Sequence, residues 1–192
     1  MARDRASRAE ATPLRLFVAV EVPDDVRDLV ERAVAPLRET YPRATWVPKQ
    51  NQHVTLKFLG STYPRLLDWV MGSIGEVAGS SQPIPTRVQA LGAFPSERRA
   101  AVLWAGVDDP AGRMTELATS LDTSLAREFA PEKRAFTPHL TVARFRPAER
   151  LGELPTGLRS EPFTIDHVVL FRSQVRRPAP IYTRIGTFAL GG

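Results

Sequence analysis

The sequence of 192 residues contains no cysteine, which excludes disulfides, a thiol nucleophile and any cysteine-ligated zinc site. Neither a Gly-x-Gly-x-x-Gly loop nor the Walker pattern occurs, so the common glycine-rich phosphate loops are absent. No apolar run is long enough to span a bilayer. Residues 1–12 are charged and lack an apolar run, so we expect a disordered tail there and not a signal peptide. Together these absences predict a cytoplasmic protein.

Lysine is also scarce, because only Lys49, Lys57 and Lys133 are lysine among 26 basic residues. The net charge of +5 permits a polyanionic partner without requiring one. Arginine suits phosphate recognition because its planar guanidinium matches phosphate oxygens. The codon bias of a GC-rich genome would also favour arginine, and we prefer this explanation for most of these residues.

The apolar pattern predicts a mixture of strands and helices. Alternation indicates strands over 14–22, 45–47, 52–59, 86–94, 101–107, 138–145, 163–171 and 182–190. Helical spacing indicates helices between 24 and 42, over 65–77 and from 109 to about 129. Strands joined by short turns favour an α+β fold with largely antiparallel sheets over a doubly wound parallel sheet. The polar loop at 79–85 is the best candidate for a boundary between two halves.

One pattern occurs twice: a histidine, an apolar residue, a threonine and a second apolar residue. It reads HVTL at 53–56 and HLTV at 139–142, and each copy lies within a predicted strand. Two of the three histidines of the chain belong to these copies. Their separation of 86 residues is close to half of the chain length, which indicates two similar half-domains that contribute to one shared site.

In a strand, residues i and i+2 point to the same side of the sheet. His53 and Thr55 therefore share one face, which Lys57 continues, and His139 and Thr141 share another. With an unperturbed pKa of about 6.5, one imidazole can be neutral while the other is protonated. Such a pair can deprotonate water and protonate a leaving oxygen, while hydroxyls donate to phosphate oxygens. The motifs thus predict a metal-free acid–base site, for which a cyclic phosphodiester is a suitable substrate.

Other interpretations of these histidines are weaker. A single His-x-Thr segment is usually structural, so it is the repetition in matching contexts that favours a site. Two histidines without nearby carboxylates or cysteines leave the usual zinc or non-haem iron ligand set incomplete, so neither a metal nor another cofactor is expected. The third histidine, His167, lacks a threonine two residues later and is interpreted as structural.

Further segments extend the pattern along nearly the whole chain after the tail. They are RLFVA at 15–19, WV at 46–47, HVTLKFLG at 53–60, GAFP at 92–95, VLWAGV at 102–107, FTPHLTVAR at 136–144 and a Tyr-x-x-x-x-x-Phe-x-Leu ending at 182–190. In the identity and order of these segments the sequence resembles the 2H phosphoesterases. Among them it is most similar to the bacterial and archaeal RNA 2′,3′-cyclic phosphodiesterases, also called 2′-5′ RNA ligase or LigT-like proteins.

The resemblance implies a bilobal, pseudo-two-fold duplicated α+β fold in which two largely antiparallel sheets face a central cleft, with helices on the outside. Residues 13–192 would form this single catalytic domain from two interleaved half-domains. It also implies metal-independent hydrolysis of RNA 2′,3′-cyclic phosphate ends to 2′-phosphomonoesters. In that reaction His53 would be the proton donor to the leaving 3′ oxygen and His139 the proton acceptor. Thr55 and Thr141 would bind the phosphate.

Two more residues are candidate substrate contacts. Lys57 has the strand parity required for a contact with RNA. Arg144 closes the second motif, but parity places it on the face away from His139, so its role is expected to be structural unless the strand twists or bulges. The clustered candidates for the RNA backbone are three basic pairs, Arg98-Arg99, Lys133-Arg134 and Arg176-Arg177.

Several alternatives stay open at this point. Ligation would be the same displacement with a 5′-hydroxyl RNA end in place of water, and a related enzyme would act on small cyclic nucleotides. A silent module that binds RNA ends is a different class, and the paired histidines argue against it because arginine or lysine would bind as well. The expected partner is RNA with 2′,3′-cyclic phosphate ends or a cyclic nucleotide, bound by a monomer that does not associate with membranes.

Overall fold

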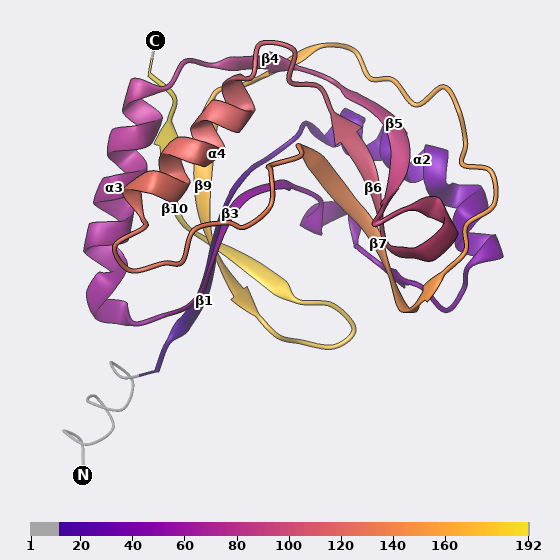
Figure 1. Cartoon of the computed structure of the whole chain (residues 1–192), viewed down its shortest axis with the longest axis horizontal. Helices are drawn as coiled ribbons and strands as arrows, with labels where there is room; N and C mark the ends of the chain where they lie inside the picture. The colour runs from indigo at the N-terminus through magenta and orange to yellow at the C-terminus, as the bar shows by residue number, and fades with distance from the viewer. Residues whose placement is uncertain (1–11, 192) are drawn as a thin grey trace.

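The computed structural model describes residues 12–191, so nearly all of the predicted tail at 1–12 lies outside the described residues. The strands are β1 (Leu14–Val20), β2 (Thr45–Trp46), β3 (Val54–Thr62), β4 (Ile84–Thr86), β5 (Val88–Phe94), β6 (Ala100–Val107), β7 (His139–Glu149), β8 (Phe163–Ile165), β9 (His167–Gln174) and β10 (Ile181–Ala189). The helices are α2 (Asp24–Thr40), α3 (Leu67–Ser80) and α4 (Arg113–Ser124), shown with the strands in Figure 1. Within this described part, no helix is both long and apolar enough to cross a membrane.

The main sheet consists of two antiparallel halves. Its strand order is β10-β9-β1-β3-β7-β6-β5, with β2 beside β7. The halves β10-β9-β1-β3 and β7-β6-β5 meet through a single residue pair, Val54 of β3 with Leu140 of β7. A small separate sheet pairs β4 with β8. The predicted α+β fold with two largely antiparallel sheets is therefore confirmed.

The helices cover the halves in an interleaved way. Helices α3 and α4 pack together, with α3 against β9 and β10 and α4 against β3, while α2 lies beside the half formed by β5, β6 and β7 (Figure 1). Tyr41, which follows α2, meets the ring of Phe145 in β7 edge-on at 5.8 Å. Arg38 of α2 lies 4.7 Å from the ring centroid of Trp46 in β2. Each half thus uses chain from both sides of the loop at 79–85.

Helix α4 is shorter than its apolar pattern predicts. It begins after Gly112, which has a φ of 70°, and not directly after Asp109. The Asp109 carboxylate still caps the helix, because it accepts the backbone N–H groups of Met114 at 3.0 Å and Thr115 at 2.9 Å. The helix ends at Ser124, and turns occupy the following residues that were expected to be helical.

Two apolar clusters lie on opposite faces of the first half-sheet. Alternate residues of β1, including Val18 and Val20, belong to the main core beneath the helices. The residues between them, Phe17 and Ala19, belong to a second, small cluster with Val169 and Phe171 of β9. Because successive strand residues alternate, this second cluster marks the helix-free face of the sheet. That face holds the predicted site residues.

Candidate active site

The two His-x-Thr segments meet where the half-sheets join. Val54 and Leu140, the central residues of the segments, form the pair between β3 and β7, and both are buried in the core. The histidine and threonine on either side of each central residue consequently point to the helix-free face, where all four are half-buried. In this antiparallel register each histidine lies across from the threonine of the other segment. The structure therefore gathers the four predicted site residues into one cluster.

Both imidazoles are held by a backbone carbonyl two residues earlier. His139 Nδ1 lies 2.6 Å from the carbonyl oxygen of Thr137. A carbonyl can only accept, so Nδ1 carries the proton, and neutral His139 has an unprotonated Nε2. His53 likewise bonds to the backbone of Asn51, and its Nε2 lies 3.1 Å from Thr55 Oγ1. Each motif thus directs a histidine Nε2 and a threonine hydroxyl to the same side.

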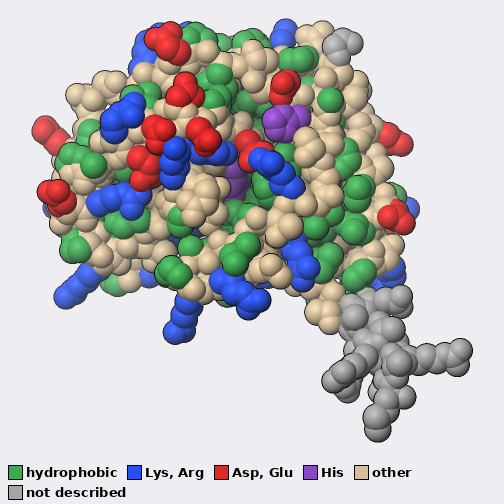
Figure 2. Space-filling view, turned by 180° about the vertical axis from the view of Figure 1, so that it is seen from behind, with side chains coloured by type: hydrophobic (Ala, Val, Ile, Leu, Met, Phe, Trp, Pro, Cys, Tyr) green, Lys and Arg blue, Asp and Glu red, His purple; other side chains and the backbone are tan. Residues whose placement is uncertain are grey.

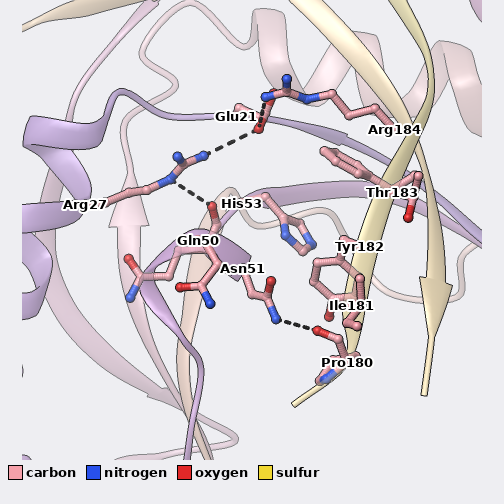
Figure 3. A pocket seen from close by; sticks show the side chains of 12 residues that line it. Glu21, Arg27, Gln50, Asn51, His53, Pro180, Ile181, Tyr182, Thr183 and Arg184 are labelled. Atoms are coloured by element: carbon pink, nitrogen blue, oxygen red, sulfur yellow. Dashed lines mark hydrogen bonds and ion pairs between the residues drawn. The ribbon is translucent and has the colours of Figure 1, made fainter. Parts of the chain in front are cut away.

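Aromatic rings enclose His53. Its ring stacks on Phe17 with centroids 4.8 Å apart. The rings of His53 and Tyr182 meet edge to face, with centroids 5.4 Å apart (Figure 3). Burial disfavours the charged imidazolium and lowers the pKa of His53 to about 4, although the bond to Asn51 opposes this shift. His53 is therefore neutral at pH 7 in the free protein. A phosphodiester anion bound beside it would stabilise the imidazolium and raise this pKa.

Aromatic rings also lie around His139, in the other half of the main sheet. The edge of Phe94 meets its ring at 5.1 Å, and Trp104 lies at 6.4 Å. Burial lowers the pKa of His139, the bond to Thr137 opposes that effect, and the positive charge of Arg144 lowers the pKa further. Neutral His139 with a free Nε2 is suited to accept a proton.

Lys57 does not face the site, contrary to the prediction from strand parity. Strand β1 pairs Ala19 with Thr55 but Val18 with Lys57, so β3 contains one extra residue between them. This β-bulge reverses the parity of the strand. Lys57 points toward the helices, where its side chain is fully buried and its Nζ forms an ion pair with Asp122 of α4. Lys57 is therefore part of the core and is not a substrate contact.

The second motif contains the same irregularity, with the opposite consequence for Arg144. In its pairing with β6, strand β7 has one extra residue between Thr141 and Ala143. The bulge places Arg144 on the same face as the site. Strand parity alone put Arg144 on the opposite face, which was wrong, and a bulge is the exception that the prediction allowed. Arg144 is exposed, and its charge acts both on His139 and on Tyr182 in the other half.

Sequence reasoning missed the aromatic residues around the histidines. Phe17, Tyr182, Phe94 and Trp104 all lie in segments that had been recognised, but without a role in the site. Strand alternation from the buried Val54 would place Phe58 on the core face, yet Phe58 is 61% exposed and its ring lies 6.3 Å from that of Phe17. Aromatic residues in strands fit the core and the helix-free face equally well, so their spacing could not show which face they occupy.

One cavity includes His53 of the cluster, and a second includes Trp104, whose ring lies 6.4 Å from that of His139. The first, of about 590 Å³, is lined by His53, Tyr182 and charged residues of β10 and α2 (Figure 3). The other, of about 500 Å³, lies against Trp104 and includes Arg98, a member of one basic pair. All three basic pairs are exposed. Figure 2 shows the face of the molecule opposite to the view of Figure 1, with basic and acidic side chains mixed around the histidine side chains visible there and mainly basic ones along the lower edge.

His167 lies outside the cluster. Its Nδ1 is 2.6 Å from Asp166 Oδ1, and its Nε2 is 3.8 Å from Glu21 Oε2. Among residues 12–191, no three histidine, aspartate, glutamate or cysteine side chains are arranged to hold a metal ion. The described cluster brings together two imidazoles and two hydroxyls, and the guanidinium of Arg144 lies on the same face.

Residues 17–177 match the 2′-5′ RNA ligase superfamily, and the chain belongs to this family. It is similar to the RNA 2′,3′-cyclic phosphodiesterase of Methanothermobacter thermautotrophicus, with 31% identity over 92% of this chain and 99% of the relative. The protein of that name from Aquifex aeolicus is 31% identical over 93% of this chain and 98% of the relative. A Geobacillus stearothermophilus protein of the same name is 29% identical, and this chain spans 57% of its length.

Solved structures show the same fold. TT0787 of Thermus thermophilus superposes with a TM-score of 0.78 and 28% identity, covering 93% of this chain and 99% of that chain. E. coli LigT complexed with NADP+ also gives a TM-score of 0.78, with 24% identity over 95% of this chain and 100% of that chain. The predicted family is thus confirmed by sequence, and the predicted architecture by structure.

Proposed function

We propose that this protein hydrolyses RNA 2′,3′-cyclic phosphate ends to 2′-phosphomonoesters by two-histidine acid–base catalysis without a metal ion. The observation that supports this proposal best is the pairing of Val54 with Leu140. That one pair sets two histidines and two threonines on one face of the sheet, in a protein whose relatives are named RNA 2′,3′-cyclic phosphodiesterases. A cyclic phosphate bound among these side chains would meet an acid, a base and two hydroxyl donors.

The reaction is an in-line displacement at phosphorus. Water attacks the phosphorus atom and gives a proton to Nε2 of His139, while the bond from phosphorus to the 3′ oxygen breaks. His53, protonated in the complex with the anionic substrate, gives its proton to that leaving oxygen. The products are a 2′-phosphomonoester and a 3′-hydroxyl, and exchange with solvent restores the two imidazoles.

The remaining groups stabilise charge on the phosphate. The hydroxyls of Thr55 and Thr141 donate to the nonbridging oxygens, whose negative charge increases in the transition state. Arg144 supplies a permanent positive charge on the same face, because the bulge in β7 turns it toward His139. This charge also favours the neutral form of His139, which is the form a base requires.

The decisive experiment uses an oligonucleotide that ends in a 2′,3′-cyclic phosphate, incubated with the protein in EDTA. Phosphorus NMR of the product separates a 2′-phosphate from a 3′-phosphate. A 2′-phosphate formed at full rate in EDTA supports the proposal. A 3′-phosphate would contradict the assigned leaving group, and activity that chelation abolishes and a divalent ion restores would contradict the metal-free mechanism. A parallel reaction with a 5′-hydroxyl oligonucleotide measures ligation.

A further inference from the structure

A cluster of charged side chains that the reaction does not use lies beside His53 (Figure 3). Glu21, in the segment between β1 and α2, is central to it. Its two carboxylate oxygens lie 2.8 and 2.9 Å from Nη2 of Arg184 in β10. Nη2 of Arg27 in α2 lies 3.6 Å from the same carboxylate. One mostly buried carboxylate thus neutralises two arginines at the wall of the cavity that contains His53.

Arg27 connects this carboxylate to the backbone that carries His53. Its Nε donates to the carbonyl oxygen of Gln52 at 3.3 Å, one residue before the histidine. The Gln52 side chain is itself held from α2, because its Nε2 donates to Glu31 Oε1 at 2.6 Å. The peptide preceding His53 is therefore fixed to α2 at two points, and Glu21 orients one of the two groups that hold it.

The turn at 49–52, which precedes His53, is also fixed to the start of β10. Asn51 Nδ2 donates to the carbonyl oxygen of Pro180 at 2.8 Å, and the backbone of Asn51 bonds to the ring of His53. Arg184 of β10 bonds to Glu21, and Glu21 contacts Arg27, so a second, indirect connection runs from β10 through Arg27 to the carbonyl of Gln52. His53 is consequently placed by contacts from α2, from β10 and from the end of β1.

Charges around His53 oppose one another. Arg27 and His139 lower the pKa of His53, in addition to burial, whereas Glu21 raises it. The charged and titratable groups around the imidazole and this cluster are Glu21, Asp24, Arg27, His139, Arg144, His167, Tyr182 and Arg184. A general acid must hold a proton when the substrate is bound, and nearby arginines oppose that unless an anion balances them.

We propose that Glu21 is a positioning residue for His53: its carboxylate balances Arg27 and Arg184 beside the imidazole and, through Arg27, orients the peptide that carries the histidine. The proposal rests on the proposed function for the role of His53 as the acid. It makes the two histidines unequal, because the anion Glu21 lies near His53 in addition to the cation Arg27, whereas the charge that acts on His139 is the cation Arg144.

Two substitutions in the cluster should shift the protonation of His53 in opposite directions. Glu21→Gln keeps the shape but removes the anion, so it should lower the midpoint at which His53 titrates by roughly 0.5–1 pH unit. Arg184→Gln leaves Glu21 less neutralised and should raise the midpoint by about 0.2–0.5 unit, since Arg184 is exposed and its charge is screened. The exposed Glu161→Gln makes the same chemical change as Glu21→Gln at a distant site and should leave the midpoint unchanged.

The measurement is an NMR titration of the imidazole resonances in protein saturated with inorganic phosphate. With three histidines in the chain, His53 is assigned by the loss of one resonance in His53→Gln. With a mononucleoside 2′,3′-cyclic phosphate, kcat at neutral pH should fall about 3- to 10-fold in Glu21→Gln while KM changes less than about 2-fold.

The proposal would be overturned if the titration midpoints of His53 in Glu21→Gln and Arg184→Gln both equal the midpoint in Glu161→Gln. It would also be overturned if both midpoints move in the same direction. If Glu21→Gln does not fold, Arg184→Gln decides alone, and an unshifted midpoint in it refutes the role of Glu21. The titration needs no turnover. A wild-type protein that fails to hydrolyse cyclic ends would therefore overturn the proposed function separately from the link between Glu21 and His53.

Discussion

Breaking the buried ion pair between Lys57 and Asp122 should cost stability, and the cost should depend on which partner is removed. The side chain of Lys57 has no exposure, and its Nζ also donates to the carbonyl oxygen of Ala130 at 3.1 Å. Asp122 is 22% exposed and accepts the backbone N–H of Glu132 at 3.1 and 3.2 Å. A lone Asp122 could be solvated in place, whereas a lone Lys57 could not.

The magnitudes follow from this difference in burial. Asp122→Ala leaves a buried ammonium without its counter-ion, and such a change costs about 3–5 kcal/mol of unfolding free energy. Lys57→Met keeps the apolar stem and leaves a carboxylate that water reaches, so its cost should be about 1–2 kcal/mol. The double variant removes both charges and should be more stable than Asp122→Ala alone, so the single effects should not add.

Urea unfolding followed by circular dichroism measures these differences at constant m-value. The matched control is the surface pair of Lys49 with Asp28, whose side chains are 35% and 49% exposed; Lys49→Met should cost at most about 1 kcal/mol. Lys57→Met should also leave KM for long RNA unchanged, because Lys57 faces the core. A Lys57→Met cost equal to or above that of Asp122→Ala, or simple additivity, would refute the reasoning.

The remaining predictions concern catalysis. His53→Ala and His139→Ala should each lower kcat/KM about 10²- to 10⁴-fold, and the double variant should lose less than the product, as steady-state rates would show. Thr55→Val and Thr141→Val should fold and lose up to about 10²- to 10³-fold in kcat with an unshifted pH profile; wild-type rates in both would exclude a phosphate contact. Burial lowers the pKa of both histidines in the free protein, and bound phosphate should raise both pKa values. The pH profile of kcat/KM, which reports the free protein, should therefore be bell-shaped, and its optimum should lie at lower pH than the optimum of kcat. Alanine substitution of the three basic pairs should raise KM for long RNA and make this KM less dependent on salt, with little effect on KM for a mononucleotide. Equal effects on both substrates would exclude contacts between these pairs and the RNA backbone.

The sequence alone predicted the family and the placement of the two motifs. Alternation of side chains in a strand is a local property. It predicted, without knowledge of any partner strand, that His53 shares a face with Thr55 and that His139 shares a face with Thr141. Repetition of the motif at half the chain length also indicated the duplicated architecture. Most strands and helices were predicted because hydrophobic periodicity reflects burial of one face. The short strand β4 was not predicted, and the single strand expected over 163–171 is divided between β8 and β9.

Tertiary structure decided the orientations beyond the motifs. A bulge depends on how many residues of one strand lie opposite the next, and β1 and β6 pair with β3 and β7 over long separations. The two bulges turn Lys57 into the core and Arg144 toward the site, against the parity rule. The ion partner of Lys57, and the group formed by Glu21, Arg27 and Arg184 around His53, join segments far apart in the chain. Sequence therefore determined the features that depend on local alternation, and packing between distant segments determined which charges reach the site.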